Sequence, residues 1–376
     1  METIVGGHVV ETEAGCLLVV RHEYPLEHRH GRLALGEARG APRHLVDVIA
    51  RDGNAPDDLS RLLFLDTETT GLAGGTGTYA FLVGAGWLED ERFVVAQYFM
   101  RDFDEEPALL ASLEPVLARA SGVVTFNGAG FDLPLLETRF IMARKRWPVT
   151  LCHLDLLRPA RRVWATRLED CRLTTLEREV LGLVREADVP GGLIPTLYFE
   201  YLRSRRAGPL ARVFAHNRAD VLSLVTLLGW FTRALEADAD AIHADELAGL
   251  GRLFEPLDLE RAIGYYRASL NAGLSGPGGQ WVRLRLALWA KRRAEWDAAC
   301  TLWQASTATR VFDARPWEEL AKYHEHRRRD AAAARAIVIE ALALARAAPA
   351  SARVVDALAY RLARLERRLA STCVHE

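Results

Sequence analysis

A strand that ends in two carboxylates places the strongest constraint on this chain. The apolar run "RLLFLDTE" (61–68) is followed at once by the glycine-rich stretch "TTGLAGGTGT". Residues i and i+2 of a strand point to the same face, so Asp66 and Glu68 converge while Thr67 points to the other face. Two like charges on a buried strand are costly unless a positive group lies between them. The pair therefore predicts an arginine or a metal ion beside it.

The segments around this strand predict an α/β domain. Strand-like runs alternate with segments whose apolar residues recur at helical spacing. The strand-like runs are 61–68, 78–88, 92–101, 122–127 and 149–157. Short turns between the first three, and helices between the rest, predict a mixed five-stranded sheet flanked by helices. Residues 208–235 follow as a long helix with a strong apolar face.

At 376 residues the chain suits two domains. Strand signals end near residue 247, and small residues recur four positions before bulky ones at a period of about 34 residues. These pairs, which resemble tetratricopeptide repeats, are Ala262 with Tyr266, Ala299 with Trp303, and Ala333 with Ile337. We expect a strand-and-turn extension packed on the α/β domain at 1–60, the α/β domain itself at 61–237, and a tetratricopeptide-like helical domain at 247–376.

Composition narrows the surroundings of the protein. No apolar run reaches the roughly 18 residues of a membrane span, and the N-terminus lacks the basic end and apolar block of a signal peptide. The five cysteines are scattered, with no CxxC pair. These features predict a reduced, cytoplasmic protein that does not enter a membrane. The net charge of −2 argues neither for nor against a nucleic-acid partner.

Two further segments carry acids toward the same strand ends. Asp132 follows the run 122–127 in "TFNGAGFDLPLL". His216 and Asp220, in "HNRADVLSL", lie one helical turn apart on one face. Taken singly, Asp132 could be a helix N-terminal charge and the His–Asp pair a surface ion pair. Taken together with Asp66 and Glu68, they favour an all-oxygen site for Mg²⁺ or Mn²⁺.

These motifs resemble the DEDD superfamily of 3′–5′ exonucleases, whose fold is ribonuclease H-like. The resemblance implies that two divalent metal ions are bound by Asp66, Glu68, Asp132 and Asp220. It implies that His216 is the general base. The histidine branch of that superfamily spaces its histidine five residues before the last acid. Here the spacing is four, as in the tyrosine branch, which leaves the geometry of the base open.

A narrower resemblance is to the bacterial YprB-type ribonuclease-H-like exonucleases, in which tetratricopeptide-like helices also follow the nuclease domain. The matching stretches are "EYPLEHRHG", "FLDTETTGLAGGTGTYAFLVG", "QYFMRDFDEEPALL", "FNGAGFDLPLLETRF", "HLDLLRPARRVW", "CRLTTLE", "DVPGGLIPTLYFEYLR" and "HNRADVLSL". Family members commonly carry a lysine where this chain has Ala129. If that lysine contacts substrate phosphate, this chain lacks the contact or supplies it elsewhere.

Several residues near the acids could contact substrate. The glycine-rich stretch is not a phosphate-binding P-loop, because no GK[ST] ends it. It could be a strand-reversing turn, a contact for the 3′-terminal nucleotide, or both. The resemblance implies Thr69, Leu72 and Asn127 as substrate contacts. A cluster of arginines could follow a nucleic-acid backbone or form a solvated helix face. It consists of Arg158, Arg161, Arg162 and Arg167.

The function that these motifs imply is metal-dependent 3′–5′ exonuclease activity on DNA, with single-stranded 3′ ends favoured. Two cations about 3.5–4 Å apart neutralise the attacking and leaving oxygens, and a histidine can accept the proton of water near neutral pH. The family context implies DNA repair, with a helicase or repair protein as a partner of the helical repeats. An exoribonuclease is the alternative enzyme, since no motif reads a 2′-hydroxyl. A catalytically weak scaffold that binds through the repeats is the alternative outside enzymes.

Overall fold

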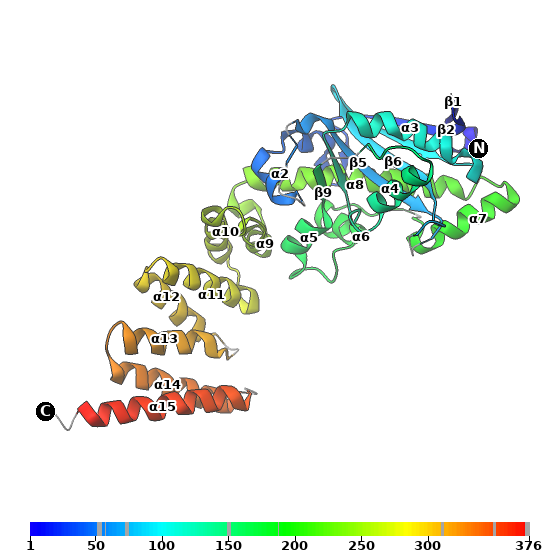
Figure 1. Ribbon diagram of the computed structural model, residues 1–376. Helices are drawn as coiled ribbons and strands as arrows, with labels where there is room; N and C mark the ends of the chain where they lie inside the picture. The colour runs from blue at the N-terminus through cyan, green and yellow to red at the C-terminus, as the bar shows by residue number, and fades with distance from the viewer. Residues whose placement is uncertain are drawn as a thin grey trace. The chain divides into compact units, whose positions relative to one another are not determined.

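The computed structural model describes residues 1–50, 55–56, 58–71, 75–148, 152–186, 188–309, 312–348 and 351–372. The chain divides into an N-terminal unit, Met1–Ile242, and a C-terminal unit, His243–Glu376. The N-terminal unit contains all the strands of the described residues, and the C-terminal unit is helical (Figure 1). No helix among the described residues is both long enough and apolar enough to cross a membrane.

Seven strands form one sheet in the N-terminal unit, in the order β1-β2-β7-β6-β5-β8-β9. Their bounds are β1 His8–Thr12, β2 Gly15–Pro25, β5 Leu62–Thr69, β6 Ala80–Glu89, β7 Arg92–Phe99, β8 Gly122–Thr125 and β9 Cys152–Asp155. In this order, each neighbouring pair among β1, β2, β7, β6 and β5 is antiparallel. The pairs β5–β8 and β8–β9 are parallel. A separate two-stranded sheet consists of β3 (Arg29–His30) and β4 (Leu33–Ala34).

The mixed sheet flanked by helices confirms the predicted fold class, but the sheet is wider than the five strands expected. We expected residues 1–60 to form an extension that packs on the α/β domain, and two strands of this segment, β1 and β2, join the sheet itself. Strand β2 pairs with β7, for example Leu18 opposite Phe99. Both residues are fully buried, so the pairing adds apolar surface to the core.

The helices of the N-terminal unit have the bounds α1 Glu2–Val5, α2 Arg43–Ile49, α3 Glu106–Arg119, α4 Asp132–Met142, α5 Leu157–Trp164, α6 Leu173–Leu176, α7 Ile194–Ser204 and α8 Leu210–Glu236. The 27-residue α8 confirms the long amphipathic helix and packs on β5, β6 and β7. Two glycines of β6 let it approach closely. A Cβ on Gly84 would lie 2.4 Å from Asn217 Oδ1, and one on Gly86 would lie 2.6 Å from Val221 Cγ1.

The C-terminal unit is a series of helices in which neighbours in sequence pack on each other. Their bounds are α9 Ala244–Phe254, α10 Leu259–Asn271, α11 Gly276–Arg292, α12 Trp296–Thr307, α13 Ala314–His326, α14 Ala331–Ala347 and α15 Ala352–Thr372. Asp258, Asp313 and Asp330 cap α10, α13 and α14 by accepting a backbone N–H of the first turn. This arrangement confirms the predicted helical repeats.

Two of the three repeat pairs identified in the sequence are buried where these helices pack. Ala262 and Tyr266 are fully buried, and Ala299 and Trp303 are buried in the next pair. In α14 the buried residues are Ala334 and Val338, one position after the pair chosen from the sequence. The shift reflects the alanine run that begins α14, because neighbouring alanines give no contrast in size by which to set the register.

Candidate metal centre

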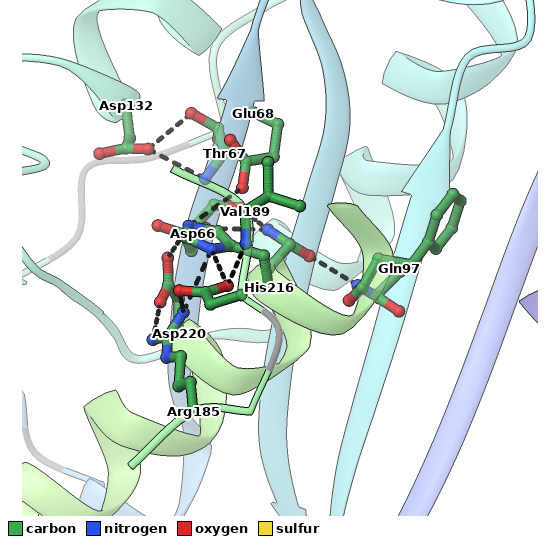
Figure 2. Close-up of polar contacts among 12 residues, drawn as sticks. Asp66, Thr67, Glu68, Gln97, Asp132, Arg185, Val189, His216 and Asp220 are labelled. Carbon is green, nitrogen blue, oxygen red and sulfur yellow. Dashed lines mark hydrogen bonds and ion pairs between the residues drawn. The ribbon is translucent and has the colours of Figure 1, made fainter. Parts of the chain in front are cut away.

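The predicted site residues meet where the parallel strands end. The sheet order places β5, β8 and β9 side by side, so their carboxyl ends share one edge. Strand β5 carries Asp66 and Glu68 near its end, and the segment after β8 leads to Asp132, the first residue of α4. Helix α8 crosses the sheet here and brings His216 and Asp220 to the same place (Figure 2).

Glu68, His216 and Asp220 form the tightest group. One ligand atom from each lies within 4.8 Å of the others. Nε2 of His216 is 3.3 Å from Asp220 Oδ2 and 4.0 Å from Glu68 Oε1. Glu68 Oε1 is buried and has no hydrogen-bond partner among the described residues. A buried carboxylate oxygen without a donor is costly, so this atom fits a ligand of a cation.

Asp66 is held by a chain of buried amides. Asn217 Nδ2 donates to Asp66 Oδ2 at 2.8 Å, and Gln97 Nε2 donates to Asn217 Oδ1 at 2.9 Å. Both amide side chains are fully buried. Gly84 is the β6 partner of Asp66, and the absence of a side chain there makes room for Asn217. The sequence could not reveal these supports, because they depend on strand register and on the position of α8.

Asp132 is anchored by Thr67 of β5. Its Oδ1 accepts hydrogen bonds from the Thr67 amide at 3.1 Å and from Thr67 Oγ1 at 2.5 Å. Strand alternation predicts that Thr67 points away from Asp66 and Glu68, and Figure 2 shows it bonded to Asp132, the first residue of α4. The residue between the two carboxylates therefore positions the third.

Burial and neighbouring negative charges raise the pKa values of Asp66, Glu68 and Asp132. Burial raises the pKa of Asp66 and of Glu68 well above the usual range, and the charges of Asp132 and Asp220 raise both further. Burial also raises the pKa of Asp132 to about 6, although the hydrogen bonds from Thr67 oppose it. Negative charge is therefore in excess at this edge of the sheet, which a divalent cation would relieve.

Arg185, which the sequence analysis did not identify, lies beside the acids. Arg185, in the loop after α6, forms an ion pair with Asp220 Oδ1 and also binds Glu177, whose side chain is 1% exposed. Burial works against its charge, but Asp220 and Glu177 raise the pKa of Arg185 overall. Within the described residues, no arginine or lysine forms an ion pair with Asp66, Glu68 or Asp132. The strand pair predicted an arginine or a metal ion, and the arginine found here neutralises only part of the charge.

The network of Arg185 continues inward to a buried histidine. Glu177 accepts a hydrogen bond from Ser223, and Ser223 Oγ lies 2.8 Å from His30 Nε2. Burial, and secondarily the charge of Arg185, lowers the pKa of His30 to about 4. His30 is therefore neutral near pH 7 and belongs to the support of the site.

Asp188 fixes the orientation of His216. His216 Nδ1 is 2.7 Å from Asp188 Oδ1. Arg185 Nη1 also lies 3.3 Å from this nitrogen, but a guanidinium can only donate, so the shorter contact to a carboxylate places the ring proton on Nδ1. Nε2 then presents its lone pair toward Glu68 and Asp220. Burial opposes ionisation of Asp188, but the hydrogen bond from His216 and the charge of Arg185 lower its pKa overall.

The three predicted substrate contacts have different outcomes. Thr69 ends β5, and its Oγ1 donates to the carbonyl of Gly71. Leu72 lies outside the described residues. Asn127 is exposed in a left-handed conformation (φ 66°), and its amide donates to Asp155. Strand β5 reverses into the antiparallel β6 beyond the glycine-rich stretch, as expected for a turn. The nucleotide contacts stay predictions.

Two comparisons with known proteins agree with this architecture. Residues 63–232 match the RNase H superfamily. The chain is also similar to the uncharacterized protein YprB of Bacillus subtilis (strain 168), with 31% identity over 365 residues that cover 94% of this chain and 86% of the relative. The matched segment begins within β5 and ends within α8, so it contains all three elements that carry the carboxylates, β5, α4 and α8. The chain therefore belongs to the family of YprB, and its residues 63–232 form an RNase H-like domain.

Proposed function

We propose that this protein is a metal-dependent 3′–5′ exonuclease that hydrolyses the phosphodiester bonds of DNA. The proposal rests on one observation. His216 Nε2 lies 4.0 Å from Glu68 Oε1, a buried oxygen without a hydrogen-bond partner among the described residues, within a cluster of carboxylates. The match of residues 63–232 to the RNase H superfamily supports nuclease chemistry at this place. The resemblance of the ordered motifs to the DEDD exonucleases supports the 3′–5′ direction.

The donor set fits divalent cations. Asp66, Glu68, Asp132 and Asp220 would hold two ions, and carboxylate oxygens are the ligands that Mg²⁺ and Mn²⁺ prefer. When bound, such ions supply charge neutralisation for the attacking and leaving oxygens of the phosphodiester. The orphaned oxygen of Glu68 and the raised pKa values of Asp66 and Glu68 are the features of this chain that favour them.

The chain's own residues accept a proton, hold the carboxylates in place and stabilise negative charge. His216 accepts the proton of the attacking water at Nε2, and Asp188 keeps the other ring proton on Nδ1. Asn217 holds Asp66, and Thr67 holds Asp132, so the carboxylates are fixed before substrate arrives. Arg185 shares Asp220 with the site and offers a guanidinium beside the place where negative charge develops.

The biological setting is a further part of the proposal. We infer that the protein acts in DNA repair on single-stranded 3′ ends, and that its helical repeats bind a helicase or a repair protein. A cytoplasmic location is supported by the four described cysteines, Cys16, Cys152, Cys171 and Cys300, which are all free. The intact set of four carboxylates and a histidine argues against a scaffold with a degenerate site.

Digestion of end-labelled strands tests the activity. Single-stranded DNA and RNA of one sequence, labelled at the 5′ end, are incubated with Mg²⁺ or Mn²⁺. We expect the DNA to shorten progressively from its 3′ end and to be protected by EDTA. Faster digestion of RNA would assign an exoribonuclease, and release of the 5′ label as a mononucleotide would contradict the direction. Intact DNA and RNA at all metal concentrations would favour the scaffold.

Two substitutions tie the activity to the proposed site. Asp66→Ala and Asp220→Asn each remove a proposed ligand, and we expect both to abolish digestion while circular dichroism shows a folded protein. Digestion by either variant at the wild-type rate would exclude this site as the nuclease centre.

A further inference from the structure

Helix α5 has one buried face and one basic face. It follows β9 directly and is eight residues long (Figure 1). The buried residues are Pro159, Ala160, Val163 and Trp164. The exposed positions Arg158, Arg161 and Arg162 are spaced i, i+3 and i+4, so they share one face of the helix.

These arginines line an open cavity beside the metal centre. The cavity has a volume of about 490 Å³. Its lining consists of Asn127, Asp155, Leu157, Arg158, Arg161 and Arg162. Asn127 belongs to the loop that leads from β8 to Asp132, so one wall of the cavity continues into the segment that carries a proposed metal ligand.

Asp155 connects the start of α5 with the loop that leads to Asp132. Its carboxylate accepts the backbone amides of Asn127 at 2.8 Å, Ala129 at 3.2 Å and Leu157 at 3.1 Å. The same charge contributes to the raised pKa of Asp132, which places the two carboxylates within electrostatic reach. Strand β9 lies two positions from β5 in the sheet, a lateral distance of roughly 10 Å at the usual strand spacing.

Many surface arginines of this unit form ion pairs with carboxylates, and Arg158 and Arg161 differ from them. Arg21, Arg39, Arg61 and Arg92 each form an ion pair with a neighbouring carboxylate. Within the described residues, no carboxylate forms an ion pair with Arg158 or Arg161. Their charge is therefore available to an anion, and a guanidinium suits the oxygens of a phosphate.

We propose that the basic face of α5 binds backbone phosphates of the nucleic-acid strand whose 3′ end enters the carboxylate cluster. This inference rests on the proposed nuclease function. Four carboxylates repel a polyanion, and the guanidiniums of Arg158 and Arg161 offset that repulsion along the strand upstream of the end. Phosphate contacts carry no sequence information, which suits an enzyme that removes nucleotides in succession.

Binding in EDTA tests the surface without any reaction. A fluorescein-labelled 20-nucleotide single strand of DNA is titrated with the full-length double variant Arg158→Ala/Arg161→Ala, and anisotropy is followed at several salt concentrations. We expect about tenfold weaker binding at low salt and a log–log salt slope that is shallower by about 1.4, since each single-strand phosphate contact contributes about 0.7. Alanine favours helix, so α5 is preserved.

The matched control is Arg203→Ala/Arg206→Ala, which removes the same charge from exposed positions at and just beyond the end of α7. We expect its affinity and slope to stay near those of the wild type. Equal losses of affinity in the two double variants would show that only net charge matters and would overturn the proposal. Unchanged affinity in the α5 variant would also overturn it.

Digestion in Mg²⁺ is a separate readout. A wild-type protein that binds the strand through α5 but never cleaves it would contradict the nuclease function and leave the binding surface standing.

Discussion

Glu68 and Asp220 face the same histidine, but only Asp220 has a cation beside it. Arg185 pairs with Asp220, whereas Oε1 of Glu68 has no donor among the described residues. The i, i+2 spacing was enough to predict that Asp66 and Glu68 converge, because strand alternation is local. Arg185 and Asp188 were not predicted, because they lie in an irregular loop whose path depends on the whole fold. Asp188 begins the stretch "DVPGGLIPTLYFEYLR" that carries part of the family resemblance, but nothing in that stretch gave the residue a role.

Asp188 should affect turnover more than substrate binding. Asp188→Ala removes the acceptor that holds the His216 ring, and we expect kcat to fall by roughly 10- to 100-fold, a part of what a general base contributes, with KM nearly unchanged. Asp188→Asn keeps an acceptor oxygen for Nδ1–H and should recover a substantial part of kcat. Steady-state digestion of a labelled strand gives both constants. A rise in KM with kcat unchanged would show that Asp188 does not position the base.

His30 should make the protein less stable in mild acid. Its pKa is lowered from 6.5 to about 4 by burial, so the unfolded chain binds the proton more readily than the folded one. The stabilisation is complete above pH 6.5 and is lost as the pH falls toward 4. Between pH 7.5 and 5, His30 should cost about 2 kcal/mol of unfolding free energy. His30→Gln should remove this part of the pH dependence in urea titrations at the two pH values. An identical pH dependence in the variant would contradict the buried, neutral histidine.

At the scale of elements, the site is built by three parallel strand ends and one crossing helix. Strands β5 and β8 and helix α8 were predictable from apolar runs and helical spacing. The addition of β1 and β2 to the sheet was not, because β2 pairs with β7 across about 80 residues of sequence and only burial selects that partner. The close approach of α8 to β6 was equally hidden, since glycines in a strand also indicate bulges or turns.

Substitutions at two glycines of β6 should distinguish an effect on the site from an effect on fold stability alone. Gly84→Ala would push its Cβ into Asn217, which holds Asp66, whereas Gly86→Ala would press on Phe93 and Val221. We expect each to cost about 1–3 kcal/mol of stability through overpacking. Only Gly84→Ala should also reduce kcat, by at least tenfold, because it displaces a ligand support. Digestion rates at a temperature where both variants are folded make the comparison. Equal kcat values would refute the role of Asn217.

At the scale of the whole molecule, a strand-bearing unit precedes a purely helical one. The helical repeats were predictable because small and bulky residues recur at a regular period, although the alanine run of α14 obscured its register. The carboxylate cluster lies wholly in the N-terminal unit, so metal binding should stabilise that unit by linkage.

Calorimetry of the full chain should therefore show one metal-sensitive transition. At a Mn²⁺ concentration 100 times Kd, binding contributes about 2.7 kcal/mol, which corresponds to a rise of about 5–10 °C in the Tm of a unit of this size. Glu68→Gln should lose most of this shift, while Glu137→Gln, an exposed acid of α4, should keep it. A shift that is the same in both variants would place metal binding elsewhere.

The measurement closest to the central claim is anomalous diffraction from crystals of the full chain soaked in Mn²⁺. The account predicts anomalous peaks within coordination distance of Glu68 Oε1 and of carboxylate oxygens from Asp66 and Asp220, and no such peaks in Glu68→Gln crystals. An empty carboxylate cluster at millimolar Mn²⁺, with Arg185 still paired to Asp220, would contradict a metal centre at these strand ends.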